Sequence, residues 1–468
     1  MLFNAPAFIF LFLPTADAVF FGLHRLRQHT WARIWLVAAS LFFYGFWNPR
    51  YLWLIGGSIV FNYAIGSLAA RAASRGARRW IGSGVIANLL LLGGFKYADF
   101  SISILNDLSG SHVGLLQIAL PLGISFFTFQ QIAYLVDCYR TGQRHHDFIN
   151  YALFVTFFPH LIAGPLVHHR RMMPQFDDPR GRCFDVQNVA QGLFLFAVGL
   201  FKKVALADTF AVWAVLGFER PEALGTLSAW VTSLSYSLQL YFDFSGYSDM
   251  ALGIARMFNI ALPINFDSPY QAHDIQDFWR RWHITLSEWL RDYVYVPLGG
   301  NRVSVPRHHF NLFVTFLVGG LWHGAGWTFV AWGALHGAAI VGHRIWQRAG
   351  LALPRPLAWG LTLLFVNAAW VFFRAKSVPD ALVILSKMAR WSGEALPFPE
   401  TIAPALLLGA AIALRLPNAL QISGLLPYQG RLTFQRGWLA AVFIGCTLFY
   451  VLVAQVQNSA SQFLYFNF

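Results

Sequence analysis

Three histidines stand in surroundings where a titratable side chain is unusual. His283 lies in FWRRWHITLSEWLR (278–291), and His323 and His336 lie in the apolar stretch 310–341. Imidazole titrates near neutral pH, so it can take up or release a proton under physiological conditions. Ionisable residues at membrane depth are rare and usually face a cavity or pathway. For the two histidines of the apolar stretch, a hydrogen bond to a neighbouring helix accounts equally well for their presence.

The segment around His283 is amphipathic if it is one helix. Residues 278–293 then place an apolar stripe on one side and most charges on the other: Phe278, Trp282, Leu286 and Leu290 against Arg280, Arg281, Glu288 and Arg291. Asp277 and Arg281 are four residues apart and can pair on the helix face. The segment is too charged to span lipid. Two placements remain open: a helix in the membrane interface, or a helix that lines a polar cavity.

The apolar stretch 310–341 is longer than one membrane span requires. Its glycines form two GxxxG pairs, Gly320/Gly324 and Gly333/Gly337, which allow close approach of helices. If the stretch is one helix, His323 and His336 point in different directions. We therefore do not expect these two histidines to act as a pair.

The elements that must position these residues are expected to be membrane helices. The 468 residues are 57% hydrophobic and 12% charged, against roughly 25% charged in a soluble domain. We expect an all-α polytopic membrane protein with about eleven to thirteen apolar passes, some of them re-entrant or half-helices. The candidate segments are 3–23, 31–47, 51–70, 80–98, 115–136, 150–167, 190–216, 226–242, 310–341, 356–373, 402–416 and 437–456.

The chain shows no linker composition, so residues 1–468 are expected to form a single integral membrane domain, with 235–341 as its most informative region. The start MLFNAPAFIFLFLP has no basic region before its apolar run and no small-residue cleavage site after it. It is therefore expected to remain as a span and not to be removed as a signal peptide.

Basic residues gather in alternate connections. They are Arg25, Arg27 and Arg33; Arg71, Arg75, Arg78 and Arg79; and Arg140 and Arg144. The connections between them, 47–51 and 97–112, are poor in basic residues or acidic. Because positive loops stay in the cytoplasm, the N-terminus is expected on the extracytoplasmic side. The net charge of +13 then reflects this pattern and contact with anionic membrane lipids, and nucleic acid is not an expected partner.

Several site classes lack their sequence signature. The three cysteines, Cys138, Cys183 and Cys446, have no metal-ligand spacing, and the histidine pairs in RHH (144–146) and HHRR (168–171) have basic neighbours that repel a cation. We therefore expect no metal and no permanently bound cofactor. The chain has no phosphate-binding P-loop and no GxSxG motif, which disfavours a nucleotide hydrolase and a serine hydrolase.

Two blocks resemble a known family. They are SYSLQLYFDFSGYSDMALGIARMFNIALPINFDSPYQAHDIQDFWRRWHITLSEWLRDYVYVPLGGNR (235–302) and GGLWHGAGWTFVAWGALHG (319–337). The chain resembles the membrane-bound O-acyltransferases, and within them the AlgI-like branch named for alginate O-acetylation. The start of the chain, FFPHLIAGP (157–165) and the terminal FLYFNF match as well, so the resemblance covers the chain from end to end.

The resemblance implies a ring of tilted helices around a central funnel or tunnel. It implies an O-acyltransferase of the bacterial inner membrane that moves an acetyl group from cytosolic acetyl-CoA toward an extracytoplasmic acceptor, for O-acetylation of a secreted or cell-envelope polysaccharide. An extracytoplasmic SGNH-hydrolase-like acetyltransferase, or another acetyl-accepting protein, is the implied partner. Carried over by motif, the essential histidine is His323 of LWHG and its earlier partner is His283 of FWRRWH, while His336 has a packing role.

The chemistry of the residues agrees with this assignment. Acyl transfer to an alcohol needs a base, and neutral imidazole has a suitable pKa of about 6.5. His323 is expected to be that base, with His283 orienting it or polarising the thioester carbonyl. Trp322 and Trp327 are expected to exclude water from His323. Together with Trp279 and Trp282, they are expected to line the substrate tunnel.

Two alternatives remain. A D-alanyl transferase of the teichoic-acid type would take its acyl group from a carrier protein. A secondary transporter or flippase would also show many spans with polar groups inside them. It would tolerate loss of a base at His323, whereas an acyltransferase would not.

Overall fold

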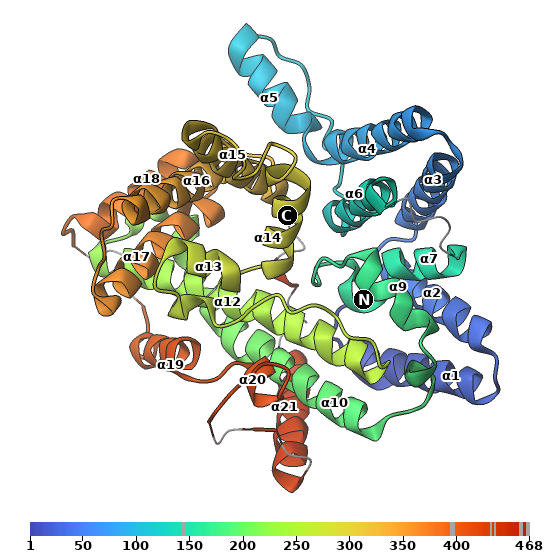
Figure 1. Cartoon of the computed structure of the whole chain (residues 1–468). Coiled ribbons are helices and arrows are strands. Elements are labelled where there is room, and N and C mark those ends of the chain that lie inside the picture. The colour runs from blue at the N-terminus through green and yellow to red at the C-terminus, as the bar shows by residue number, and fades with distance from the viewer. Residues whose placement is uncertain (142–146, 394–397, 431–432, 435–436, 458–461, 465–468) are drawn as a thin grey trace. The chain divides into compact units, whose positions relative to one another are not determined.

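The computed structural model describes residues 1–468 except 142–146, 394–397, 431–432, 435–436, 458–461 and 465–468 (Figure 1). Within the described residues the regular structure is helical and contains no strand, which confirms the all-α class. The chain divides into two compact units. The first comprises 1–196, 250–263 and 458–462, and the second comprises 197–249, 264–457 and 463–468. The expectation of a single domain over 1–468 stays a prediction.

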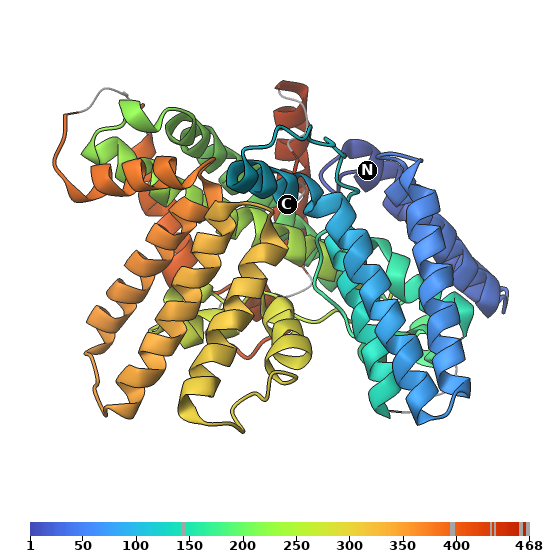
Figure 2. The same ribbon diagram turned by 90° about the horizontal axis from the view of Figure 1, so that it is seen from above.

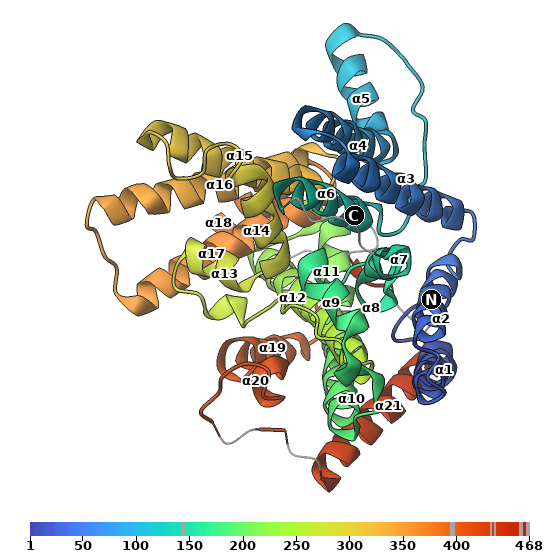
Figure 3. The same cartoon turned by 45° about the vertical axis from the view of Figure 1, so that its right-hand side comes forward.

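The first unit is built from the N-terminal helices. They are η1 (Phe8–Phe12), α1 (Leu13–Arg25), α2 (His29–Gly45), α3 (Tyr51–Arg71), α4 (Ser74–Lys96), α5 (Ala98–Ser109), α6 (Ile124–Thr141), α7 (Phe148–Thr156), α8 (Phe158–Leu161), α9 (His169–Asp177) and η2 (Pro179–Arg182). Helices α10 (Val186–Phe201) and α12 (Thr226–Met257) contribute residues to both units. Helices α3, α4 and α6 lie side by side (Figure 3).

Buried amides join these three helices. Asn88 Nδ2 of α4 donates to Asn62 Oδ1 of α3 at 2.6 Å, and Gln131 Nε2 of α6 donates to Ser58 Oγ of α3 at 2.9 Å. All four side chains are at least nine-tenths buried. Since a buried polar group is costly unless it is paired, these bonds fix the facing positions of the helices.

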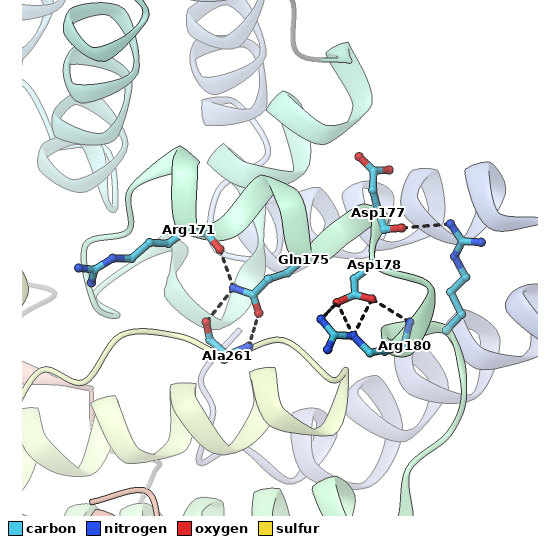
Figure 4. A network of polar contacts seen from close by, with 7 residues as sticks. Arg171, Gln175, Asp177, Asp178, Arg180 and Ala261 are labelled. Carbon is cyan, nitrogen blue, oxygen red and sulfur yellow. Dashed lines mark hydrogen bonds and ion pairs between the residues drawn. The ribbon is translucent and has the colours of Figure 1, made fainter. Parts of the chain in front are cut away.

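A polar network fixes the chain where α9 ends (Figure 4). Gln175 Nε2 donates to the backbone oxygen of Ala261 at 3.1 Å, and Gln175 Oε1 accepts from the Ala261 backbone N–H at 2.8 Å. Asp178 accepts from the backbone N–H and the guanidinium of Arg180, which lowers the pKa of this exposed carboxyl. The first unit thereby holds the extended segment that follows α12.

The second unit carries the helices of the C-terminal half. They are η3 (Lys202–Ala207), α11 (Asp208–Glu219), η4 (Pro221–Ala223), η5 (Pro269–Gln271), α13 (Ile275–Arg281), α14 (Ile284–Leu290), η6 (Arg291–Tyr295), α15 (Val305–His323), α16 (Trp327–Arg348), α17 (Arg355–Arg374), α18 (Val378–Ala389), α19 (Ile402–Arg415), α20 (Ala419–Ile422) and α21 (Trp438–Gln457). Helices α15, α16 and α17 lie side by side (Figure 2).

The stretch 310–341 is not one helix, so the expectation that His323 and His336 lie on one helix was wrong. Helix α15 ends at His323 and α16 begins at Trp327, and the backbone between them is extended at Gly324 and Gly326. The two helices pack closely because Gly333 faces α15. A Cβ atom there would lie 2.7 Å from the backbone oxygen of Phe316. The reversal runs through Gly-Ala-Gly, and a Cβ atom at Gly324 would collide with the Phe329 ring.

Buried ion pairs hold α12 inside the second unit. Lys202 Nζ lies 2.6 Å from Asp249, and Lys203 Nζ lies 2.7 Å from Asp243. The backbone N–H of Leu464 also donates to Asp243, at 2.8 Å. The first residues of the terminal FLYFNF therefore bind α12, and residues 465–468 lie outside the described part of the chain.

Among the described residues, five helices are long and apolar enough to cross a membrane, or up to six if the bent pair α4–α5 is one span. They are 8–25, 51–71, 186–219, 355–374 and 438–455, with 74–109 as the bent pair. Other expected segments form shorter or more polar helices, such as α7 with 9 residues. The expected segment 115–136 contains helix only from Ile124. Together these helices indicate a multi-pass membrane protein.

Candidate active site

The segment that carries His283 is not one helix, and the expected stripe over 278–293 was wrong. Helix α13 ends at Arg281 and α14 begins at Ile284. His283 lies between them at φ 43° and ψ 53°, the left-handed region that residues with a Cβ atom rarely adopt. The break turns the chain, so that the side chains of α13 and α14 do not share one face. The expected pair on α13 does form, with Arg281 Nε 3.0 Å from Asp277 Oδ1.

Asn265 holds this break from outside the helices. Its backbone oxygen accepts from the Ile284 N–H at 3.0 Å, and its Oδ1 accepts from the Thr285 N–H at 3.3 Å. Oδ1 also lies 2.9 Å from Thr285 Oγ1 and 3.1 Å from His283 Nδ1. The first N–H groups of a helix need an acceptor. Asn265 supplies two such acceptors for α14, its backbone oxygen and its Oδ1. The Oδ1 atom also contacts His283.

His323 is the last residue of α15 and is 2% exposed. Aromatic rings surround it, with ring-centroid distances of 4.9 Å to Trp322, 5.1 Å to Trp332 and 5.0 Å to Phe373. These rings come from α15, α16 and α17. The packing of three helices therefore fixes the position of the imidazole, in aromatic surroundings of low polarity.

The structure brings the two predicted catalytic histidines together. The ring centroids of His283 and His323 are 6.3 Å apart, and the Trp322 ring lies 5.9 Å from His283. His283 is fully buried, and it lies outside the helices long enough to span a membrane. Burial lowers the pKa of His283 to about 3, because a charged imidazole loses its hydration there. His283 is therefore neutral at physiological pH and can accept a hydrogen bond.

The four predicted tunnel tryptophans differ in position. Trp282 and Trp322 are 0% and 4% exposed, and Trp279 is 8% exposed. Trp327 is 58% exposed, and its expected shielding of His323 from water stays a prediction. Trp332, five residues further along α16, packs against His323. Trp327 is exposed because it is the first residue of α16 and directly follows the reversal.

His336 belongs to the same aromatic cluster. It is fully buried, and its Nδ1 accepts from Trp279 Nε1 at 3.2 Å. The Trp332 ring lies between the two histidines of this region, 4.8 Å from His336 and 5.1 Å from His323. The hydrogen bond ties α13 to α16, which agrees with a packing role for His336.

Sequence reasoning missed three residues of the site: Asn265, Trp332 and Phe373. Asn265 was within the block 235–302 and Trp332 within 319–337, so their location in the matching motifs was a usable signal. Phe373 lies in an ordinary apolar run, and nothing in the sequence distinguishes it. In the part of the chain that the structure describes, no group of three or more metal-ligating side chains occurs. His145 and His146 lie outside that part.

Comparison with known proteins places these motifs in a family. The family model for the membrane-bound O-acyltransferase family matches residues 139–376. The chain is 50% identical over 427 residues to a peptidoglycan O-acetyltransferase of Helicobacter pylori, covering 85% of this chain and 81% of that protein. It is 44% identical over 391 residues to a probable alginate O-acetylase AlgI of Pseudomonas aeruginosa, covering 81% and 73%.

A more distant relative belongs to a different transfer class. A teichoic acid D-alanyltransferase of Streptococcus thermophilus is 29% identical over 239 residues, which covers 48% of this chain and 57% of that protein. The described site, with two buried imidazoles and a wall of aromatic rings, contains the groups that acyl transfer to a hydroxyl requires.

Proposed function

This chain belongs to the membrane-bound O-acyltransferase family, and from that premise we propose that it transfers acetyl groups for O-acetylation of a cell-envelope or secreted polysaccharide. The donor is cytosolic acetyl-CoA, and the acetyl group passes across the bacterial inner membrane toward an extracytoplasmic acceptor. The N-terminus faces the extracytoplasmic side, because the basic connections then face the cytoplasm. The relatives support two polymers, since one is named for peptidoglycan and one for alginate.

One observation carries the proposal. His323 and His283 come from separate elements, yet they lie 6.3 Å apart in one buried aromatic cluster. A buried imidazole is costly unless it is used or satisfied. Two imidazoles at this separation can act together on one hydroxyl group and one thioester. The rings of Trp322, Trp332 and Phe373 keep water, a competing nucleophile, away from the thioester.

The reaction assigns a role to each histidine. His323 takes the proton of the acceptor hydroxyl as that oxygen attacks the acetyl carbonyl carbon. The new carbon–oxygen bond forms and the carbon–sulfur bond of the thioester breaks. The sulfur leaves as a thiolate and receives the proton from His323, so the histidine is neutral again. His283 supports this proton transfer from its position beside His323.

The identity of the donor and the direction of transfer can be tested with membrane vesicles. Radiolabelled acetyl-CoA is added to inside-out and right-side-out vesicles that contain the protein and its cellular acceptor. We expect label in the acceptor fraction of inside-out vesicles, and none from His323→Ala vesicles of equal protein content. Label from a D-alanyl carrier protein in place of acetyl-CoA would support the alternative of D-alanyl transfer. Equal labelling of both vesicle types would contradict the direction.

The immediate acceptor is an extracytoplasmic acetyl-accepting protein, of the SGNH-hydrolase-like kind. A polysaccharide chain does not pass easily through a narrow protein tunnel, so a relay protein is the simpler acceptor. Purified protein in proteoliposomes should acetylate polymer slowly until the extracytoplasmic fraction is added. If the protein alone acetylated alginate or peptidoglycan at the full rate, no relay would be needed. Comparison of the two polymers in this assay identifies the final substrate.

A further inference from the structure

Asn265 makes an unusual set of contacts with the break between α13 and α14. It is 1% exposed, and it contacts three consecutive residues, His283, Ile284 and Thr285. His283 itself provides no side-chain cap for α14. Asn265 therefore replaces the usual capping residue and touches the catalytic candidate at the same time.

The backbone of Thr285 determines which way the Asn265 amide points. A backbone N–H can only donate a hydrogen bond, so the amide atom 3.3 Å away from it must be the oxygen. The amide nitrogen then faces Ser248 Oγ, at 3.5 Å. The opposite orientation would place two donors against each other and leave the Thr285 N–H without this acceptor.

The same oxygen determines the tautomer of His283. Asn265 Oδ1 is an acceptor only, and it lies 3.1 Å from His283 Nδ1. Nδ1 must therefore carry the proton. In a neutral imidazole one nitrogen donates and the other accepts, so Nε2 of His283 carries the lone pair.

We propose that Asn265 is a positioning residue that holds His283 in the Nδ1–H tautomer, so that its Nε2 acts in the reaction chamber as a hydrogen-bond acceptor. The effect on catalysis rests on the proposed acetyl transfer, whereas the tautomer does not. In this state Nε2 cannot donate to a thioester carbonyl. It accepts instead, either from an imidazole N–H of His323 or from the incoming hydroxyl group. The polarising role for His283 that the sequence left open is thereby excluded for the neutral ring.

The tautomer can be measured without an activity assay. Solid-state NMR of protein with 15N-labelled histidine, in liposomes, distinguishes protonated from unprotonated ring nitrogens, and subtraction of the His283→Gln spectrum isolates one of the 15 histidines. We expect His283 to be protonated at Nδ1 in the native protein and in Asn265→Asp, which keeps an acceptor oxygen. In Asn265→Ala we expect that signal to be lost or mixed with the Nε2–H form. An Nε2–H tautomer in the native protein would overturn the proposal.

Activity then tests whether the tautomer matters. Asn265→Ala should lower the kcat of acetyl transfer at least about tenfold with little change in KM, because a wrongly held imidazole loses its function while substrate contacts remain. Asn265→Asp should keep the transfer activity but raise the pKa of His283 itself, followed by pH titration in the 15N spectra, by about 1–3 units, since a carboxylate favours the charged imidazole. An unshifted titration of His283 in a well-folded Asn265→Asp protein would contradict the contact with His283.

A matched control separates positioning from stability. Asn311 is also fully buried, and its Nδ2 donates to the backbone oxygen of Gly300 at 3.1 Å, which ties a loop to α15. Asn311→Ala should lower thermal stability but leave the tautomer and the pH titration of His283 unchanged. If Asn311→Ala and Asn265→Ala had the same effects, Asn265 would be a structural residue only. A native Nδ1–H tautomer in a protein without any acetyl transfer would reject the proposed function and leave the tautomer assignment intact.

Discussion

The two histidines of the site are held by different kinds of contact. His283 lies at a break between two short helices, in a left-handed backbone conformation, and an amide oxygen of Asn265 faces its Nδ1. His323 lies at the end of a 19-residue helix, where the rings of Trp322, Trp332 and Phe373 surround it. Directional polar contacts determine the protonation of His283, and the packing of aromatic rings determines the position of His323.

This difference indicates how the two residues can divide the work. A hydrogen bond to one ring nitrogen fixes the tautomer and leaves the other nitrogen with a defined role. Aromatic contacts fix the plane of a ring. We propose that His323 exchanges a proton during the reaction, whereas His283 keeps one state throughout. The following variants test this division.

The largest effect is expected from His323→Ala. General acid–base catalysis contributes about 10²–10⁴-fold in rate, so transfer should fall to that extent. His323→Gln should be no better, because an amide cannot take up a proton. Acetyl transfer is measured with membrane expression checked by blot, and His336→Ala serves as the control that mainly lowers yield. Retention of more than about a tenth of native transfer by well-expressed His323→Ala would assign the base role elsewhere.

His283→Ala should lower acetyl transfer less than His323→Ala does. Loss of a supporting group leaves the base in place, and misplacement of a reacting group costs on the order of 10- to 100-fold. The same vesicle assay gives the ratio of the two variants. A loss for His283→Ala equal to that for His323→Ala would show that the two imidazoles act as one unit, and the division between them would not hold.

Gly333→Ala should disturb the aromatic cluster around His323 without changing a polar side chain. Its Cβ atom would lie 2.7 Å from the backbone oxygen of Phe316, so α15 and α16 must separate. Overpacking of this kind costs about 1–3 kcal/mol, and a lower thermal midpoint in detergent is the measurement. Gly342→Ala in the same helix is the matched control, since no atom lies within 4 Å of its Cβ position. Equal midpoints for both variants would contradict the close packing.

Asp277→Asn should have the smallest effect. The ion pair with Arg281 is 3.0 Å long, and its side chains are 24% and 32% exposed. Partly exposed pairs contribute about 0–1 kcal/mol, because water and salt screen them. Thermal stability and acetyl transfer should both stay close to native, and a loss of transfer above twofold would mean that α13 depends on this pair. The variant thereby tests the Asp277–Arg281 pair independently of His283.

Much of the fold followed from local properties of the sequence. Apolar length and low charge indicated a helical membrane protein, and several expected segments match helices closely, such as 51–70 with α3 and 356–373 with α17. The breaks were harder to predict. Residues 278–293 are helical in propensity on both sides of His283, and the contacts of Asn265 with α14 stabilise the left-handed residue between them. At the reversal, Gly324 and Gly326 indicated a break in the helix, but the length of the apolar run favoured one continuous helix.

By itself the sequence determined the helical and apolar character of the chain, because these are properties of short segments. Its motifs also pointed to His323 and His283. It also selected Trp279, Trp282 and Trp322, which are buried in the second unit. Only the tertiary structure decided that the two imidazoles lie 6.3 Å apart, that Trp332 packs against His323, and that Asn265 bonds to His283. These are contacts between residues from separate helices, and their distances depend on how whole elements pack, which no local pattern specifies.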